Sequence, residues 1–348
     1  MIKNQKKNSG INYKKYKISI IIPCRNEEKY IAKCLNSIIE QDYPIDNLEV
    51  IVVDGISEDK TIQIVENYRK KFLSIKILKN PKKTTPYACN LGINNSRTDI
   101  IMMIGAHSTI GKNYISKSVN YLYEYNVDNV GGLLVVLPGN TKILAKSIVL
   151  ALSHPFGVGN AHYKIGSKEL KYVDTVFGGC YRKEVFKKIG LFNEKLIRNQ
   201  DIEFNLRLKK AGGKILLVPD IVSYYYARST LRALAKNNFS NGFWVVYSTK
   251  FAKMPFSIRH LIPFFFILSV CGSLILSFIY RPFIYLFVLV FVAYLISNIL
   301  FSLGISFKKG FKYFIPVILS FATLHFSYGF GSIWGLIKLA GGRFKKLI

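Results

Sequence analysis

The first two thirds of the chain alternate between two hydrophobic patterns. Short runs rich in Ile, Val, Leu and Met occupy residues 17–23, 48–54, 74–78 and 99–104, which is typical of buried strands. Between them, apolar residues recur at helical spacing: Ile31, Leu35, Ile38 and Ile39 after the first run, and Ile62, Ile64 and Val65 after the second. This alternation predicts an α/β domain with a mostly parallel sheet, whose ligands bind at the carboxyl ends of the strands.

The C-terminal part has a different pattern, because long stretches carry no charge. The twenty residues from Leu261 to Tyr280 are uncharged, and so are residues 282–307 and 313–337. At a rise of about 1.5 Å per residue, each stretch covers roughly the 30 Å of a bilayer core. A charge at the bilayer centre costs about 2.5 to 3.5 kcal/mol on insertion scales. The pattern therefore predicts two or three transmembrane helices.

The chain is strongly basic, with a formal net charge of +29. Every Asp and Glu lies at or before Asp220, whereas fourteen Lys and Arg residues follow it, many of them flanking the uncharged stretches. Basic residues at the ends of membrane helices follow the positive-inside tendency and attract anionic lipid headgroups. The placement predicts membrane lipids as a partner and no nucleic acid. A general preference for Lys in the source genome is the alternative explanation of the excess.

These patterns divide the chain into four predicted parts. They are a basic N-terminal arm (1–16), an α/β domain (17–227), an amphipathic linker (228–259) and a membrane region (260–348). The apolar run after the arm is too short for the core of a signal peptide. The five cysteines show no CxxC spacing, so neither a zinc site nor a disulfide framework is predicted, and a reducing, cytosolic setting suits the α/β domain.

Polar segments follow the predicted strands, where ligands are expected. "PCRNEE" (23–28) follows the first strand and "DGISEDKT" (54–61) the second, "TPYACNLG" (85–92) precedes the fourth, and "GAHS" (105–108) follows it. Gly55 permits a turn that directs the carboxylates of Asp54 and Asp59 into the crevice, where they can accept hydrogen bonds from a nucleobase or ribose. The alternative is that they only form a turn and cap the next helix.

His107 and Asp201 are the candidates for chemistry. His107 is either a solvent-facing loop histidine or a ligand of a divalent cation, whose other ligands would come from phosphate oxygens, water and a distant carboxylate. Asp201 lies in the first turn of a predicted helix, where the helix dipole favours the ionised form that a general base needs. Ordinary helix capping is the alternative for Asp201. Glu203 points away from it around the helix and is expected to be structural.

A glycine pair precedes a short polar segment further along the chain. Gly178 and Gly179, followed by Tyr181 and Arg182, could form a tight wall on the acceptor side of a site. A plain buried turn explains the glycines equally well.

The six segments, with "FGGCYRKEVFKKIGLFNE" (177–194) and "NQDIEFNLRL" (199–208) last, resemble the family 2 inverting glycosyltransferases. The resemblance covers about residues 17–250 and is greatest to the membrane-bound bacterial exopolysaccharide enzymes related to the succinoglycan chain-extending glucosyltransferases. It implies a nucleotide-diphosphosugar-binding (GT-A type) domain. The nucleotide-sugar pocket that it implies is formed by Pro23, Arg25, Asn26, Glu27, Asp54, Ser57, Asp59, Pro86 and Asn90, with Gly92 beside the last two.

The same resemblance assigns the catalytic roles and shows one departure. Asp201 falls at the position of the general base, and Gln200 stands where the family usually has Glu. His107 keeps the position that faces the metal, but Gly105 replaces the Asp that normally precedes it by two residues. Hydrogen bonds to charged groups contribute about 1.5 to 3 kcal/mol, so the loss predicts binding of donor or cation weakened by about ten- to a hundredfold.

The expected function is transfer of a sugar from a nucleotide diphosphosugar, with inversion, onto a membrane-associated acceptor in cell-surface polysaccharide or glycolipid synthesis. The acceptor is expected to be lipid-linked or a polysaccharide. The expected cofactor is Mn²⁺ or Mg²⁺, although the replacement of the usual Asp by Gly105 leaves the need for a metal open. The chain is expected to be a multi-pass protein of the cytoplasmic membrane with its catalytic domain in the cytosol. A polyprenyl-phosphate sugar synthase and a catalytically impaired scaffold are the alternatives.

Overall fold

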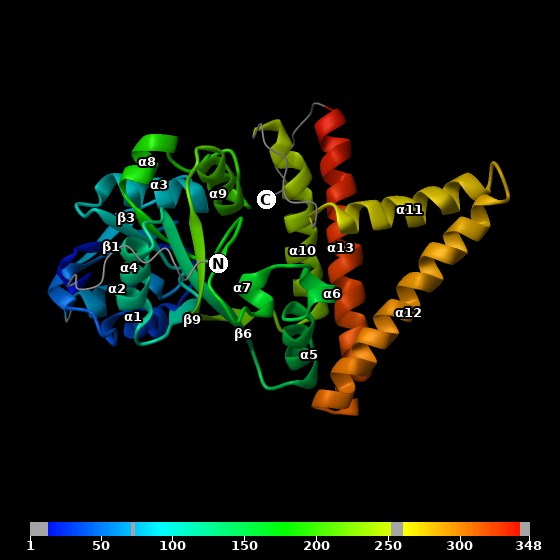
Figure 1. Cartoon of the computed structure of the whole chain (residues 1–348), viewed down its shortest axis with the longest axis horizontal. Helices are drawn as coiled ribbons and strands as arrows, with labels where there is room; N and C mark the ends of the chain where they lie inside the picture. The colour runs from blue at the N-terminus through cyan, green and yellow to red at the C-terminus, as the bar shows by residue number, and fades with distance from the viewer. Residues whose placement is uncertain (1–12, 71–73, 252–259, 342–348) are drawn as a thin grey trace. The chain divides into compact units, whose positions relative to one another are not determined.

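The computed structural model describes residues 13–70, 74–251 and 260–341 (Figure 1). The chain divides into two compact units. The first comprises residues up to Val135 together with His162–Tyr225, and the second comprises Val136–Ala161 and the residues from Tyr226 onward. Residues 136–161, which the sequence placed inside the α/β domain, therefore pack with the C-terminal helices. Most of the predicted N-terminal arm lies outside the described residues, although Tyr13 is buried in the first unit.

A mixed sheet forms the centre of the first unit. Its described strands are β1 (Ile18–Cys24), β2 (Leu48–Asp54), β3 (Ile75–Lys79), β4 (Ile100–Met103), β5 (Ser108–Ile110), β6 (Asn129–Pro138), β7 (Lys171–Tyr172), β8 (Cys180–Arg182) and β9 (Ile215–Ala227). The order is β3-β2-β1-β4-β8-β6-β9-β5, with β7 paired to β9. The four strands predicted from the sequence are β1 to β4; they pair in parallel, whereas β8 runs antiparallel to β4.

Helices cover both faces of this sheet. They are α1 (Ile31–Ile39), α2 (Thr61–Arg69), α3 (Thr85–Asn95), α4 (Tyr114–Glu124), α7 (His162–Ile165), α8 (Glu184–Ile189) and α9 (Gln200–Lys210), with short 3-10 turns at Tyr13–Lys15 and Ile45–Asn47. The helices predicted between the first three strands are confirmed as α1 and α2. The register aligns Cys24 with Asp54, so the first two strands end side by side at one edge of the sheet.

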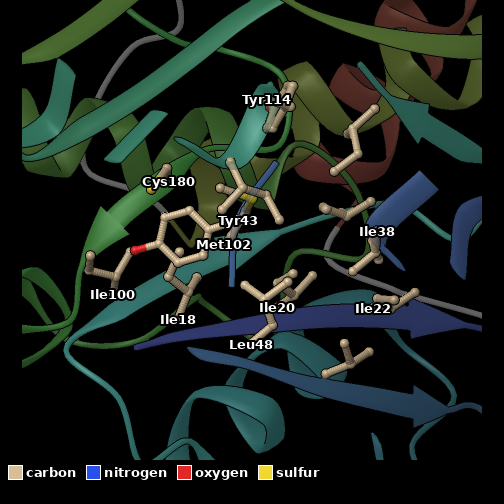
Figure 2. Close-up of a cluster of buried hydrophobic side chains, with 14 of the residues drawn as sticks. Ile18, Ile20, Ile22, Ile38, Tyr43, Leu48, Ile100, Met102, Tyr114 and Cys180 are labelled. Carbon is tan, nitrogen blue, oxygen red and sulfur yellow. The ribbon is translucent and has the colours of Figure 1, made fainter. Parts of the chain in front are cut away.

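The core lies on the two faces of the parallel strands, because successive side chains of a strand point to opposite faces. On one face Ile18, Ile20 and Ile22 of β1 pack with residues of α1, α2 and α4 (Figure 2). On the other, Ile21 packs with residues of α3, α8 and α9. Burying one such side chain contributes about 1.5 to 3 kcal/mol. This packing fixes the edge at which the polar segments lie.

The second unit is helical. Its elements are α5 (Ile143–Leu152), α6 (Pro155–Val158), α10 (Leu231–Tyr247), α11 (Ile262–Ser277), α12 (Phe283–Lys309) and α13 (Phe314–Ala340), with 3-10 turns at Ser248–Lys250 and Phe311–Tyr313. Two stretches, Phe283–Lys309 and Phe311–Ala340, are long and apolar enough to cross a membrane, and α11 is a shorter apolar helix. The number of membrane crossings stays a prediction, because these stretches are defined by length and composition alone.

Candidate active site

The loops after β1 and β2 hold each other in place. The backbone N–H of Asn26 donates to Ser57 Oγ (2.9 Å), and the N–H of Glu58 donates to Asn26 Oδ1 (2.9 Å). Asn26 and Ile56 have φ values of 55° and 60°, the left-handed region that side chains rarely adopt. The strained pair of turns is held by these reciprocal bonds, so the two predicted nucleotide-binding loops form one rigid element.

The carboxylates of Asp54 and Asp59 both accept hydrogen bonds from this element. Asp54, buried at the end of β2, accepts the Ser57 N–H (3.1 Å) and hydroxyl (2.5 Å). Asp59 accepts the Thr61 N–H (3.0 Å) at the start of α2 and the Glu28 N–H (3.1 Å). Slight burial raises the pKa of Asp59, but the hydrogen bonds from Thr61 outweigh it and hold this pKa below its ordinary value. The turn and capping roles, which were the alternatives, are therefore present.

The carboxylate that faces His107 comes from the loop after β1. His107 Nδ1 lies 3.0 Å from Glu27 Oε1, and both side chains are partly buried. The backbone of Glu27 is itself fixed, because its N–H donates to Thr61 Oγ1 (2.7 Å) and its carbonyl accepts the Ile31 N–H (2.9 Å). With Nδ1 directed at a carboxylate, the neutral ring carries its lone pair on Nε2, the arrangement found in metal-binding histidines.

An aromatic contact joins His107 to the far half of the sheet. The His107 ring meets the ring of Tyr225 on β9 edge-on, with centroids 5.2 Å apart, and Tyr225 meets Phe177 at 6.4 Å. Phe177 directly precedes the glycine pair. Sequence reasoning missed Tyr225, which carries no motif beyond the run of three tyrosines at 224–226. Pairing of β5 with β9 brings it to this place.

The glycine pair is required by the backbone. Gly178 and Gly179 have φ values of 71° and 106°. A Cβ at Gly178 would lie 2.8 Å from the Met103 carbonyl oxygen, and one at Gly179 would lie 2.6 Å from the Tyr181 ring. The Met103 N–H donates to the Gly179 carbonyl (3.0 Å), so the pair lies beside the carboxyl end of β4. Both positions therefore require glycine, as the buried-turn alternative also predicts, and the acceptor-side role of the pair stays a prediction.

Tyr181 and Arg182 serve the fold and not an acceptor wall. Tyr181 is 1% exposed and packs in the core against Phe186 and Phe204. The guanidinium of Arg182 donates to the carbonyls of Val127 and Leu122 at 3.1 Å each, at the end of α4. Successive side chains of β8 point to opposite faces of the sheet, so these two side chains lie on the faces and not at the edge.

The predicted residues of α3 are buried. Asn90 Nδ2 donates to the Phe192 carbonyl (2.9 Å) and to Glu194 Oε1 (3.0 Å), and Asn90 Oδ1 accepts the Phe192 N–H (2.9 Å). Pro86 lies in the first turn of α3, and a Cβ at Gly92 would lie 2.5 Å from Ile21. Asn90 and Gly92 thus position α3, and any contact with a nucleotide would come from the beginning of this helix.

The remaining predicted pocket residues come from β1 and from the loop that follows it. Pro23 is paired with Val53 within the sheet. The side chain of Arg25 is partly exposed and lies 4.0 Å from the carboxylate of Glu58. Its exposure leaves the guanidinium available to a phosphate.

Asp201 lies in the first turn of α9, on the face of the sheet covered by α3. Burial raises its pKa above the ordinary value of Asp, although the N–H groups of Ile202 and Asp201 itself and the charge of Lys164 act in the opposite direction. Burial raises the pKa of the Cys89 thiol, and the nearby charge of Asp201 raises it further. The predicted influence of the helix dipole is present, but desolvation outweighs it.

Glu203 is structural, as the sequence predicted. Its carboxylate binds the guanidinium of Arg207 one turn later at 2.8 Å and 3.0 Å. Arg207 also donates to the carbonyls of Ile189 and Leu191, so the pair ties α9 to the end of α8. Among the residues that the structure describes, Asp201 is the acid of this turn that forms no such ion pair.

Within the described residues, no three His, Cys, Asp or Glu side chains converge in a way that could hold a metal ion by themselves. If a divalent cation binds here, the described residue that would hold it is His107, whose ring is oriented by the carboxylate of Glu27. A bound cation would neutralise charge on a departing diphosphate.

The sheet order, with a parallel half followed by antiparallel strands and polar loops at the edge of β1, β2 and β4, defines an α/β nucleotide-sugar-binding fold. The family model "Glycosyl transferase family 2" matches residues 19–190. A protein of Methanococcus voltae, described as a dolichyl N-acetyl-alpha-D-glucosaminyl phosphate 3-beta-D-2,3-diacetamido-2,3-dideoxy-beta-D-glucuronosyltransferase, is 34% identical over 332 residues, which is 92% of this chain and 97% of that protein. The chain belongs to glycosyl transferase family 2 and is a glycosyltransferase.

Two further proteins are similar to this chain, one in sequence and one in fold. The succinoglycan biosynthesis protein ExoA of Rhizobium meliloti is 26% identical and aligns with 64% of this chain and 67% of its own. The mannosyltransferase PcManGT of Pyrobaculum calidifontis, solved with GDP-Man and Mn²⁺, superposes with a TM-score of 0.58 at 18% identity, over 99% of this chain and 93% of that one. The predicted family and GT-A type fold are both confirmed.

Proposed function

We propose that this chain transfers a sugar from a nucleotide diphosphosugar, with inversion, onto a hydroxyl of a lipid-linked acceptor at a membrane. The observation that carries the mechanism is the place of Asp201 in the first turn of α9, where burial raises its pKa above the ordinary value of Asp. The acceptor class is supported by the Methanococcus voltae relative, whose described acceptor is a dolichyl-phosphate-linked sugar.

In the proposed reaction Asp201 accepts the proton of the acceptor hydroxyl while its oxygen attacks the anomeric carbon. The bond from that carbon to the diphosphate breaks, so the sugar changes configuration once and the nucleoside diphosphate leaves with the electron pair. The rigid element formed by the loops after β1 and β2 positions the nucleotide, and Arg25 is available to the phosphates.

His107 and Glu27 are proposed to act at the diphosphate. Glu27 holds the His107 ring, and His107 Nε2 would be the protein's ligand to a divalent cation at the diphosphate. The mannosyltransferase PcManGT, which has the same fold, was solved with Mn²⁺. Such a cation supplies positive charge where negative charge develops on the leaving group.

The experiment measures nucleotide release by detergent-purified protein from a panel of sugar nucleotides, with Mn²⁺, Mg²⁺ or chelator, in the presence of a polyprenyl-phosphate-linked sugar. Asp201→Asn keeps the shape of the side chain and should lower kcat by about 10² to 10⁴ with the KM for the donor unchanged. Equal rates for the two proteins would remove Asp201 as the base. A sugar-lipid formed on polyprenyl phosphate alone would indicate the synthase reaction instead.

A further inference from the structure

The position of Asp201 depends on how α9 is anchored in the first unit. The N–H groups in the first turn of a helix have no partners within that helix, so a first turn relies on contacts from outside it. Asn199, where α9 begins, has a φ of 61°, in the left-handed region that side chains rarely adopt. The residues that tie α9 to the rest of the unit therefore help to decide where the carboxylate of Asp201 lies.

Asn205 follows Asp201 by one turn on the same side of α9, and it is fully buried. Its amide bonds to three other segments of the chain. Oδ1 accepts hydrogen bonds from Asn129 Nδ2 of β6 (3.1 Å) and from the Tyr181 hydroxyl of β8 (3.4 Å). Nδ2 donates to Thr175 Oγ1 (3.0 Å), in the segment between β7 and β8. One side chain thus joins α9 to two strands and a loop.

These four residues form a buried polar network. Asn129, Thr175, Tyr181 and Asn205 are each at most 5% exposed. A buried donor or acceptor that loses its partner is costly, so the bonds of the network resist being broken. If Asn205 shifted or its amide turned over, the donors of Asn129 and Tyr181 would lose their shared acceptor. The network therefore holds α9 at one position against the sheet.

The Thr175 end of the network belongs to the segment that leads to the glycine pair. Thr175 precedes Gly178 by three residues. This segment lies tightly against β6, because a Cβ at Gly131 would lie 2.5 Å from Val176 Cβ. The helix that carries Asp201 and the segment that carries the glycine pair are thus bonded to each other through Asn205.

The network also comes close to the carboxylate of Asp201. Burial raises the pKa of the Tyr181 phenol, and the nearby charge of Asp201 raises it further, whereas the bonds from Asn129 and Asn205 act in the opposite direction. The hydroxyl that bonds to Asn205 therefore lies near the proposed base.

We propose that Asn205 is a positioning residue for sugar transfer, which holds Asp201 at a fixed place relative to the glycine pair. The inference rests on the proposed function, in which Asp201 accepts the proton of the acceptor hydroxyl. Proton transfer needs the two oxygen atoms within hydrogen-bond reach, and a displacement of about 1 Å can lower a rate by about 10²-fold. Asn205 acts on the rate through the place of the base and not through binding of the donor.

A double-mutant cycle on the full chain tests this role. Nucleotide release is measured with the sugar nucleotide that the native protein turns over fastest and a polyprenyl-phosphate-linked sugar as acceptor. Asn205→Ala should lower kcat by about ten- to a hundredfold, with the KM for the donor within about twofold of the native value. In an Asp201→Asn background, Asn205→Ala should change kcat by less than about twofold, because a positioning residue has nothing to position once the base is removed.

The cycle separates the two ways in which the inference can fail. Equal losses of kcat from Asn205→Ala in both backgrounds would overturn the positioning role and leave Asp201 as the base. A native rate in Asp201→Asn alone would remove the base, and the positioning role with it.

A matched pair of Thr→Val variants separates positioning from loss of stability. Thr175→Val removes the hydroxyl that accepts from Asn205, and Thr98→Val removes a buried hydroxyl that bonds to Ser19 near the first residues of β1 and β4. Thr175→Val should lower kcat by about three- to tenfold. Thr98→Val should keep kcat within about twofold of the native value, with a similar decrease in melting temperature. Equal kcat values for the two variants would overturn the proposal, because the network would then serve stability alone.

Discussion

His107 and Glu27, eighty residues apart in sequence, place Nδ1 and Oε1 3.0 Å from each other. The two residues follow neighbouring parallel strands, β4 and β1. In the proposed function the pair supplies a carboxylate at the diphosphate, where the family resemblance predicts an Asp in place of Gly105. It also fixes which ring nitrogen of His107 is left to face a ligand.

Removing the carboxylate of this pair should loosen the histidine. Glu27→Gln is expected to raise the Mn²⁺ or Mg²⁺ concentration needed for half-maximal activity by about ten- to a hundredfold, because partners behind a metal ligand typically contribute that much. The measurement is a metal titration of nucleotide release. Glu28→Gln is the control, since its carboxylate accepts the Lys60 N–H instead. An unchanged half-maximal concentration in Glu27→Gln would show that the pair does not serve a cation.

Restoring the missing carboxylate should strengthen binding. Gly105 does not have a positive φ, and a Cβ there would lie 3.3 Å from Ser108 Oγ, a buried hydroxyl without a hydrogen-bond partner among the described residues. Gly105→Asp is therefore expected to fold and to bind donor or cation about ten- to a hundredfold more tightly. Calorimetry on Gly105→Asp beside Gly105→Ala measures this. Turnover that appears only in Gly105→Asp would identify the native chain as an impaired enzyme.

The raised pKa of Asp201 predicts how stability depends on pH. A carboxyl group with a pKa higher in the folded than in the unfolded state stabilises the fold at pH values below both, and that contribution is lost as pH rises from the unfolded to the folded pKa. Asp201→Asn should therefore unfold at a higher temperature than the native protein near neutral pH, with the difference shrinking as pH falls toward 4. Thermal scans across pH check this. A less stable Asp201→Asn at neutral pH would contradict the burial argument.

The same group predicts the pH dependence of the rate. Because the base must be ionised, kcat should rise with pH through the pKa of Asp201, and the acidic limb should lie above the ordinary value of Asp. The Asp201→Asn variant should lose this limb and keep a low, flat rate. A limb that survives unchanged in the variant would assign the titration to another residue.

The glycine beside Tyr181 offers a test of backbone strain against steric clash. Gly179 and Gly212 both have positive φ, 106° and 82°, but a Cβ at Gly212 has no heavy atom within 4 Å, whereas one at Gly179 meets the buried Tyr181 ring. Gly212→Ala should cost about 1 kcal/mol of unfolding free energy and Gly179→Ala about 2 to 4 kcal/mol. Denaturant unfolding measures both. Equal costs would mean that the Tyr181 ring moves aside.

Arg182 distinguishes a role in the fold from a role at the acceptor. Arg182→Ala removes the guanidinium donor to the Val127 carbonyl and one of two donors to the Leu122 carbonyl, which still accepts the Val127 N–H, and should lower the unfolding free energy by about 1 to 3 kcal/mol. The KM for acceptor should stay within about twofold of the native value. A large increase in that KM without loss of stability would restore Arg182 to the acceptor side.

Local patterns in the sequence were sufficient to predict the parallel half of the sheet, the loops that carry polar residues and the apolar character of the C-terminal helices. These features depend on local periodicity and on turn residues, which a single segment records. The order of the six motifs was also sufficient to predict the family. The structural role of Glu203 could be predicted as well, because helical spacing alone places it on a different side of the helix from Asp201.

Which of these residues contact one another depends on how the strands and helices pack. The pairing of Glu27 with His107 depends on the order of β1 and β4 in the sheet, and the inward direction of Tyr181 and Arg182 depends on the register of a three-residue strand. Residues 136–161 join the C-terminal helices through contacts that no local pattern encodes. The raised pKa of Asp201 has the same origin, since desolvation is set by what packs around a carboxylate, whereas the helix dipole is set by its position in the chain.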